Sequence, residues 1–284
     1  MIRARQARWA RSGGTTGMSI NYINKINNDL RDKNNKDTHR LIHNLITLNA
    51  HNIQEIYSII PQGEISKESG DKIKFVCSAI EKDPIEAAKT LLRIAKNNAA
   101  MKTEFSVFNK LFGKPKELRS TSHTMHKVLM NILYLFFPDF TDKGVKVIVN
   151  RDNASAYFDY ESIHVALYHL IDNAAKYTRN NSELSINIKT VEPYVILVFQ
   201  MKSIKILPNE VEKIYEEGFS GSLSQGLLKS GNGIGMNLVK RILELNHGSV
   251  SHISQPNTCE KWCGIEYQVN EFIIQLPMHK HSVQ

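Results

Sequence analysis

The segment LIDNAAKYT occupies residues 170–178. Its spacing predicts a helix that carries Asn173, Lys176 and Tyr177 about one turn apart on one side and apolar side chains on the other. A carboxamide oxygen can bind Mg²⁺, and an ammonium group can neutralise phosphate. The helix is therefore a candidate part of a phosphate and metal site, although a polar helix face without such a function has the same pattern.

A glycine-rich loop, GNGIGM at residues 231–236, precedes a second amphipathic helix. Gly231, Gly233 and Gly235 allow backbone N–H groups at the start of a helix to face phosphate oxygens. Glycines before a helix also serve tight turns alone, so the loop by itself does not decide between the two roles. It does not follow a strand at the spacing of a dinucleotide-binding fold, which disfavours that fold.

Strands alternate with helices around these two segments. Apolar periodicity predicts strands over residues 145–149, 154–158, 184–189, 194–200, 249–254 and 264–276, and helices over residues 123–137, 160–177, 208–217 and 234–246. The C-terminal half should therefore be an α/β sandwich, with one mixed sheet and its helices on one face.

The N-terminal half is purely helical by the same criteria. A leucine and isoleucine stripe predicts one helix over residues 37–60, and the capping sequence Asp83-Pro84-Ile85-Glu86 predicts the start of a second helix that ends near Phe112. Two helices alone have little to bury themselves against. We therefore expect two chains to form a four-helix bundle, which makes the protein a homodimer through residues 37–112.

Composition limits the class of protein. The chain has 284 residues, of which 42% are apolar, and no apolar run reaches the ~18 to 20 residues of a membrane span. Its three cysteines suit reduced thiols rather than a disulfide framework or a zinc site, so we expect a cytoplasmic protein without a membrane segment. The net charge is +8, but four arginines lie within residues 1–17. That stretch resembles a leader or fusion remnant, and nucleic-acid binding is the weakest of the possible functions.

Order and spacing of the motifs resemble those of sensor histidine kinases. Residues 170–178 are similar to the N box of these kinases, and residues 217–221 are similar to their F box. Residues 231–236, together with residues 247–248, are similar to their G2 box. The resemblance covers residues ~123 to 277 and implies a histidine kinase-type ATPase fold. It implies a lid across residues 219–230.

The same resemblance implies the ligand and its contacts. ATP would bind with Mg²⁺ held by Asn173, and its phosphates would meet Lys176 and the backbone amides of the glycine loop. The nucleotide-binding residues that the resemblance implies are Asn173, Lys176, Tyr177, Met201, Phe219, Gly231, Gly233, Ile234, Gly235 and Met236.

The G1 box departs from the family pattern. Family members carry Asp-x-Gly-x-Gly there, and the aspartate accepts a hydrogen bond from the adenine amino group. This chain has Met201 for the aspartate and Ser203 and Lys205 for the glycines, and no aspartate follows Asp172. A buried hydrogen bond to a charged acceptor contributes about 1.5 to 3 kcal/mol, so we expect roughly ten- to hundredfold weaker or less adenine-selective binding. His169 lies where other ATPases of this fold carry a catalytic glutamate, and a packing histidine fits that position as well.

The first helix contains a candidate phosphoacceptor. His43 and Thr47 fit the His-x-x-x-Thr arrangement of the family, in which imidazole attacks the γ-phosphate and Thr47 can position water for hydrolysis. His43 lies about 200° around the helix from Leu41, so it can face solvent. Asn44 replaces the acidic residue that usually accepts the proton. A surface histidine without function remains an alternative, and its rivals as acceptor are His39, His51 and His126.

These observations give two hypotheses for one domain plan. Residues 18–115 would form the dimerisation and histidine-phosphotransfer hairpin, and residues 120–284 the ATPase domain. The first hypothesis is a histidine kinase that autophosphorylates a helix histidine and passes the phosphate to a response regulator. The second is a degenerate relative, a phosphotransfer intermediate or scaffold that binds ATP weakly or not at all and docks on another kinase. The sequence does not identify the sensed signal or the partner. It also does not show whether the phosphate is transferred within one chain or across a dimer.

Overall fold

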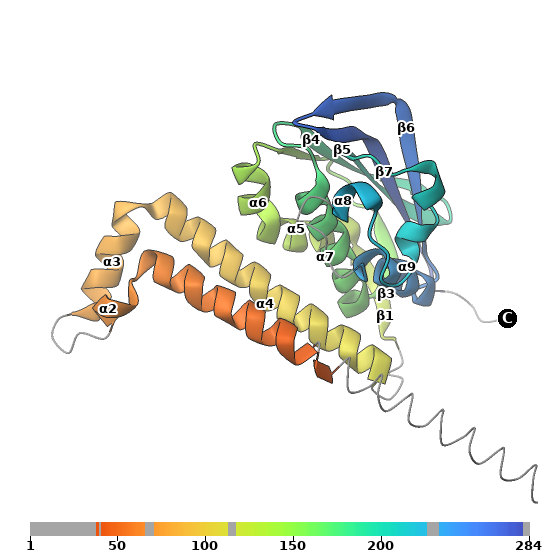
Figure 1. Ribbon diagram of the computed structural model, residues 1–284. Coiled ribbons are helices and arrows are strands. Elements are labelled where there is room, and N and C mark those ends of the chain that lie inside the picture. Colours follow the sequence, from red (N-terminus) through yellow and green to blue (C-terminus); the bar gives the residue numbers. More distant parts are fainter. Residues whose placement is uncertain (1–37, 40, 66–70, 113–117, 226–232, 281–284) are drawn as a thin grey trace, which may run out of the picture.

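The computed structural model describes residues 38–39, 41–65, 71–112, 118–225 and 233–280. The predicted leader at residues 1–17, Gly231 of the glycine loop and residues 226–230 of the predicted lid lie outside these ranges. Two parts make up the described chain, a long helical hairpin and an α/β sandwich that packs against one side of it (Figure 1). None of the described helices is long and apolar enough to cross a lipid bilayer.

The hairpin pairs a helix over residues 41–59, called the first helix below, with α4 (Pro84–Phe112). The two run side by side along most of their length (Figure 1). The Asp83 side chain accepts a hydrogen bond from the Glu86 backbone N–H at 2.9 Å, which confirms the predicted start of α4.

Two helices that the sequence did not predict lie at the tip of the hairpin, α2 (Gln62–Ile65) and α3 (Lys72–Lys82). Asp71 caps α3 by accepting from the backbone N–H groups of Ile73 and Lys74, at 3.1 and 3.2 Å. None of the side chains of α3 is buried. Ile73, Val76 and Ile80 nevertheless have helical spacing, so the sequence contains an apolar signal for this helix that the prediction did not include.

The helix predicted over residues 123–137 differs from the structure at both ends. It begins after a strand, and its last part is divided into shorter helical segments. Residues 120–124 form strand β1 (Ser120–Thr124), which pairs antiparallel with β3 (Ser155–Asp159). The helical part divides into α5 (Met125–Leu133), the 3₁₀ turn η1 (Tyr134–Phe136) and α6 (Phe137–Asp142), where Pro138 begins the new helix. The strand was missed because its partner is about thirty residues away and β1 is polar.

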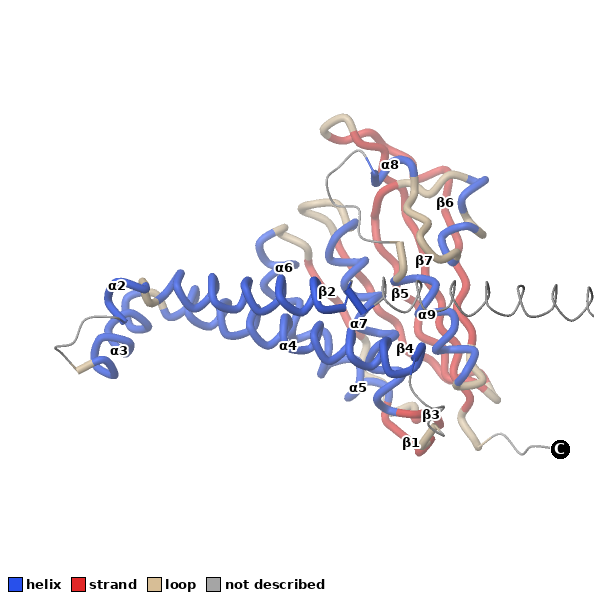
Figure 2. The backbone as a smooth tube through the Cα atoms, turned by 60° about the horizontal axis from the view of Figure 1, so that its bottom comes forward, coloured by secondary structure: helices blue, strands red, loops and turns tan. Residues whose placement is uncertain are grey.

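The predicted strand over residues 154–158 corresponds to β3, which pairs with β1 in a separate two-stranded sheet, so the prediction of a single sheet was wrong. A five-stranded mixed sheet carries the sandwich. Its strand order is β2-β4-β5-β7-β6, with β2 and β4 parallel and the other pairs antiparallel. The strands are β2 (Lys146–Val149), β4 (Glu183–Val191), β5 (Tyr194–Ile204), β6 (Ser249–Trp262) and β7 (Ile265–Pro277). The helices α5, α7 (Tyr160–Tyr177) and α9 (Gly235–Leu245) cover one face (Figures 1 and 2). The fold is thus the predicted α+β sandwich.

One apolar core joins the inner face of the sheet to these helices. Phe199 and Leu197 of β5 and Ile171 and Leu167 of α7 are almost completely buried in it. Every second residue of β5 from Val195 to Met201 is buried, as expected for a strand with one covered face. This core fixes α7 against β5, and so sets one wall of the cavity described below.

The predicted helix over residues 208–217 is replaced by two 3₁₀ turns, η2 (Pro208–Glu210) and η3 (Lys213–Tyr215). The reason is the buried side chain of Glu210, whose Oε1 accepts hydrogen bonds from the backbone N–H and hydroxyl of Ser222, at 2.9 and 2.7 Å. Burial raises the pKa of Glu210, but the hydrogen bonds from Ser222 outweigh this effect and lower it. Glu210 therefore stays ionised and ties the turn to the short helix α8 (Ser222–Gln225).

Ion pairs join the hairpin to the sandwich between α4 and α6. Lys89 and Arg93 contact Asp142 at 2.5 and 3.1 Å, and Lys96 contacts Asp139 at 2.6 Å. These five residues are called the docking cluster below. The hydrogen bond from Lys89 is the main cause of the lowered pKa of Asp142. Since Asp142 is 45% exposed, each pair contributes at most about 1 kcal/mol, and the cluster sets the docking angle through several pairs together.

Candidate nucleotide site

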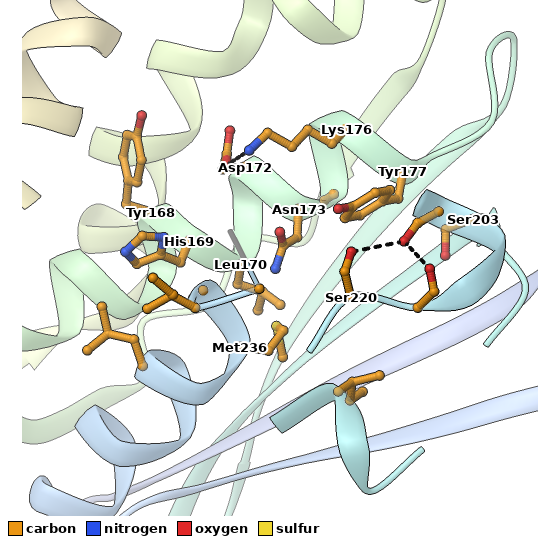
Figure 3. Close-up of a pocket in the computed structure, with 18 of the residues that line it drawn as sticks. Tyr168, His169, Leu170, Asp172, Asn173, Lys176, Tyr177, Ser203, Ser220 and Met236 are labelled. Carbon is orange, nitrogen blue, oxygen red and sulfur yellow. Dashed lines mark hydrogen bonds and ion pairs between the residues drawn. The ribbon is translucent and has the colours of Figure 1, made fainter. Parts of the chain in front are cut away.

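A cavity of about 610 Å³ lies where α7, β5 and the start of α9 meet the hairpin. This volume falls within the roughly 300–1,000 Å³ of small-molecule sites. In the view of Figure 3, Tyr168 and His169 lie at one end of the cavity, Ser203 and Ser220 lie at the other, and Asn173 lies between them. The described members of the predicted nucleotide-binding set all line it, namely Asn173, Lys176, Tyr177, Met201, Phe219, Gly233, Ile234, Gly235 and Met236.

Helix α7 brings Asn173 to the middle of the cavity. Asp159 caps its start by accepting from the Ser162 backbone N–H at 2.9 Å. Asn246, at the end of α9, is 2% exposed and donates to the Ser162 hydroxyl at 2.9 Å, which holds α9 against α7. Both walls at the phosphate end are therefore fixed by one buried polar contact.

Lys176 is not isolated at the cavity wall. Its ammonium group forms an ion pair with Asp172, one turn earlier on α7, at 2.5 Å. The lysine side chain is 41% exposed, so the pair is a weak one that a phosphate group can compete with. The i,i+4 spacing of Asp172 and Lys176 indicates this ion pair, which the role predicted for Lys176 did not include.

The start of α9 presents backbone donors to the cavity. Gly235 begins the helix, and the Leu238 N–H donates to the Ile234 carbonyl. The backbone N–H groups of residues 235–237 therefore have no acceptor within the helix. Such a helix start favours an anion. A Cβ atom on Gly235 would lie 3.6 Å from His169 Nδ1 and 3.7 Å from Asn173 Nδ2, so this turn faces α7 directly.

Gly233 holds the loop before α9 against the F-box turn. Its φ is +66°, and its carbonyl accepts from the Gly218 N–H at 3.1 Å. A Cβ atom there would lie 2.5 Å from the Gly218 carbonyl carbon and the Phe219 oxygen, which are backbone atoms that cannot turn aside. Both the backbone conformation and the space therefore require glycine.

We expect Gly233→Ala to lower ATP affinity strongly and to destabilise the fold by about 1–3 kcal/mol, because the left-handed conformation and the clash both strain the loop. Gly63→Ala is the matched control, since Gly63 does not line the cavity and an added Cβ atom there would have nothing within 4 Å. Calorimetric titration with ATP and urea unfolding measure the two effects. Equal behaviour of the two variants would contradict the assigned role of Gly233.

The end of the cavity at β5 is where the G1 box departs from its family pattern. Met201 is 3% exposed and lines the cavity, whereas Lys202 points to the other face of the sheet and contacts Glu260 at 3.1 Å. The alternation along the strand therefore places Met201, and not Lys202, at the base end. Ser203 also lines the cavity, and its hydroxyl oxygen accepts from the buried Asn270 amide at 2.9 Å. A thioether and a hydroxyl thus stand where the family has a carboxylate and a glycine.

His169 lies deep in the wall between α7 and α9. It lines the cavity, and its Nε2 atom is buried without a hydrogen-bond partner among the described residues. Burial lowers the pKa of His169 to about 4, although the charge of Asp172 raises it to a lesser degree. The ring is therefore neutral at physiological pH.

This burial predicts an acid limb in stability. His169 takes up its proton near pH 6.5 in the unfolded chain and near pH 4 in the folded one, so the free energy of unfolding should fall as the pH drops through that window. The loss is about 3 kcal/mol. We expect His169→Asn to flatten this limb in urea unfolding at pH 7 and pH 4.5, and the exposed His279→Asn to leave it unchanged. If His169→Asn still lost stability between pH 7 and pH 4.5, the loss would have to come from other titrating groups.

The hairpin supplies the remaining wall of the cavity. Asn44, Thr47, Leu48 and His51 of the first helix line it, together with Lys96 and Thr103 among the residues of α4. Leu41 is buried and His43 is exposed, as the sequence predicted, but His43 is not among the lining residues.

Thr47 has a local partner in addition to its place in the cavity wall. Its hydroxyl donates to the backbone carbonyl of His43 at 2.9 Å. This is the usual back-bonding of a threonine within a helix. The roles predicted for His43 and Thr47 in phosphoryl transfer stay predictions.

Sequence patterns did not predict that the hairpin forms a wall of this cavity. Thr47 was predicted as a catalytic residue and His51 as a rival acceptor, but their position opposite α7 depends on the packing of the hairpin against the sandwich, which the docking cluster stabilises. Glu210, which also lines the cavity, could have been noticed as the acidic residue after Pro208. Its partner Ser222 carries no signal of its own.

Comparison with known proteins agrees with this geometry. Residues 158–280 match the family model described as histidine kinase-, DNA gyrase B-, and HSP90-like ATPase. The adaptive-response sensory kinase SasA of Crocosphaera subtropica is 32% identical over 113 residues, which cover 39% of this chain and 29% of SasA. Sensor protein SrrB of Staphylococcus aureus is 24% identical over 244 residues, which cover 84% of this chain and 39% of SrrB.

Solved structures show the same fold. Full-length ShkA in complex with AMPPNP superposes with a TM-score of 0.51 at 16% identity, covering 85% of this chain and 45% of ShkA. The present chain thus spans less than half of each of these proteins. By its motifs, its sandwich and these matches, residues 158–280 form a histidine kinase-, DNA gyrase B- and HSP90-like ATPase domain, and the chain is similar to sensor kinases over part of their length.

Proposed function

We propose that the chain is the catalytic core of a histidine protein kinase. It binds ATP with Mg²⁺ in the cavity, transfers the γ-phosphate to a histidine of the first helix and passes it on to the receiver domain of a response regulator. The observation that carries the proposal is the continuity of the cavity, because one space is lined by Asn173, by the start of α9 and by the first helix. The proposed nucleotide site and the helix that carries the candidate acceptor histidines therefore border one space, although His43 itself does not line it.

The residues present fit a magnesium nucleotide. Bound Mg²⁺ supplies charge neutralisation for the phosphates, and the Asn173 amide oxygen is a suitable ligand for it. The free N–H groups at the start of α9 face the same space as Asn173 and suit phosphate oxygens. His169 stays neutral beside them, so it adds no charge at this end of the cavity.

The acceptor is an imidazole on the first helix. The motif assigns this role to His43, which is exposed and therefore accessible to the ATPase domain of the same chain or of a partner. Its ring nitrogen attacks the γ-phosphorus, and ADP leaves with the electron pair of the broken bond. The adjacent Asn44 cannot take the ring proton, so solvent or another carboxylate accepts it.

Incubation with γ-labelled ATP and Mg²⁺ tests the proposal. We expect label that is stable in base and lost in acid, as for a phosphohistidine, and its transfer to an isolated receiver domain. A protein that binds ATP and takes up no label would contradict kinase activity. Chelation of Mg²⁺ should abolish labelling and leave the fold unchanged, as judged by circular dichroism.

A second candidate function is a phosphotransfer protein or scaffold that no longer uses ATP. Met201, Ser203 and Lys205 favour it, because the chain has no carboxylate at these positions to read the adenine amino group. Lys205 is moreover paired with Glu266 at 2.7 Å. Calorimetry separates the two candidates, since saturable binding of ATP supports the kinase and no heat of binding at millimolar ATP supports the scaffold.

We also propose that two chains associate through the hairpin. Large apolar side chains stand exposed along it, including Ile46 at 65%, Leu91 at 66% and Phe105 at 50%. Exposed apolar groups in such a row suit a four-helix bundle with a second copy. Sedimentation velocity of the full chain over a range of concentrations measures the association, and a monomer at all concentrations would contradict it.

A further inference from the structure

The first helix turns one face toward the cavity, and that face is defined by its lining residues. Asn44, Thr47, Leu48 and His51 lie within about 100° of one another on a helical wheel with 100° per residue. His43 lies about 40° beyond Thr47 on this wheel, outside the face, and does not line the cavity. The histidine that the docked hairpin presents to the cavity is thus His51.

We infer that His51 is a second phosphoacceptor, used by the ATPase domain of the same chain in the docked arrangement. The inference deepens the proposed kinase function and rests on it. His51 is exposed, lines the large cavity and also lines a smaller pocket of about 350 Å³ behind it. Its ring can therefore be reached from the side of Asn173 and from the side of the docking cluster.

The docking cluster keeps His51 in this position. The smaller pocket is lined by His51 and Glu55 of the first helix and by Arg93, Lys96, Asp139 and Asp142. Arg93 contacts Glu55 at 3.6 Å and Asp142 at 3.1 Å, so it joins the first helix to α6 through α4.

A proton acceptor is available at His51 and is absent beside His43. Glu55 follows His51 by one helical turn, and both line the smaller pocket, so its carboxylate lies on the same side of the helix. One ring nitrogen of His51 forms the N–P bond as the bond between the γ-phosphorus and the bridging oxygen breaks, and ADP takes the electron pair. The proton on the other ring nitrogen passes to Glu55 or to solvent, which leaves a neutral phosphohistidine ring.

Lys96 completes the arrangement from the opposite helix. It lines both pockets, as His51 does, and its ammonium group pairs with Asp139 at 2.6 Å. That charge can stabilise the phosphate as it moves from the nucleotide to the ring. Donor, acceptor, base and counter-charge are then all present within one docked chain.

Site mapping with the full chain tests the inference. Wild type, His43→Gln, His51→Gln and the double variant are incubated with γ-labelled ATP and Mg²⁺, and phosphohistidine is located by mass spectrometry at neutral pH. We expect label on His51 in wild type and in His43→Gln, and complete loss of label in the double variant. His39→Gln is the control, because this exposed histidine of the same helix does not line the cavity.

Label on His43 alone, or loss of all label in His43→Gln, would overturn the role of His51 and leave the kinase function standing. ATP binding without any label would overturn both. Absence of ATP binding in calorimetry would overturn the proposed function itself, and the role of His51 with it. Thermal unfolding of each variant separates these outcomes from failure to fold.

A charge swap in the docking cluster gives a readout that a merely structural role would not move. Asp142→Lys places a cation against Lys89 and Arg93, and we expect it to lower labelling of His51 by about fivefold. Lys89→Asp combined with Asp142→Lys restores an ion pair of reversed sign and should recover the label. Unchanged labelling of His51 in Asp142→Lys would show that docking is not needed, and would overturn transfer within the docked chain.

Discussion

Replacing Asn173 by alanine is expected to remove measurable binding of ATP with Mg²⁺. The amide lines the middle of the cavity, between the start of α9 and the base end, and it is the proposed ligand of the metal ion. A hydrogen bond or ligand contact to a charged group contributes about 1.5–3 kcal/mol, which corresponds to roughly ten- to hundredfold in affinity. Because the rewritten G1 box already weakens binding, this further loss should move the Kd beyond the millimolar range.

Asn187→Ala is the matched control for this variant, since Asn187 lies exposed on β4 and does not line the cavity. Calorimetry with ATP in the presence and absence of Mg²⁺ measures both variants, and labelling with γ-labelled ATP follows the consequence for phosphoryl transfer. Asn173→Ala with an unchanged Kd would mean that the nucleotide does not bind across α7. The site would then have to be sought elsewhere.

The sandwich was predictable because its signals are local. The apolar alternation of β5 identifies its buried face. The N-box helix and α9 were predicted within one residue of their ends. The phosphate end of the site follows from these two helices, since the residues that matter lie at fixed positions within them.

The parts that the sequence did not reveal depend on contacts between distant segments. Strand β1 exists because it pairs with β3, and the turns after Pro208 replace a helix because Glu210 is drawn to Ser222. The largest omission is that the hairpin forms a wall of the cavity, although Thr47 and His51 of the first helix were themselves named as candidates. Its place depends on ion pairs between α4 and α6, and no periodicity within either helix encodes a docking angle.

The end of the cavity at β5, where the adenine base would bind, is the part that distinguishes the proposed kinase from the proposed scaffold. Met201 and Ser203 are buried, and Asn270 fixes Ser203 from the neighbouring strand. The strand itself is regular here, since Met201 pairs with Leu184 on one side and Asn270 on the other. A base can therefore still lie against β5, but it meets sulfur and hydroxyl groups. Restoring the carboxylate measures how much this exchange costs.

Met201→Asp should tighten ATP binding by roughly ten- to hundredfold, because the carboxylate accepts a hydrogen bond from the adenine amino group worth about 1.5–3 kcal/mol. Without nucleotide the same variant should lose about 1–3 kcal/mol of stability, since the new charge is buried with no partner of opposite sign. Added ATP should then raise its melting temperature more than that of the wild type.

A second variant and a second nucleotide test whether the gain in affinity of Met201→Asp comes from the adenine amino group. Met201→Leu keeps the apolar volume and should leave the Kd for ATP unchanged. Guanine carries an oxygen where adenine carries the amino group, so Met201→Asp should gain no affinity for GTP. Calorimetry with both nucleotides measures the difference. An equal gain for GTP would place the base away from β5, whereas a gain for ATP alone would identify Met201 as the residue at which this chain differs from an adenine-selective kinase.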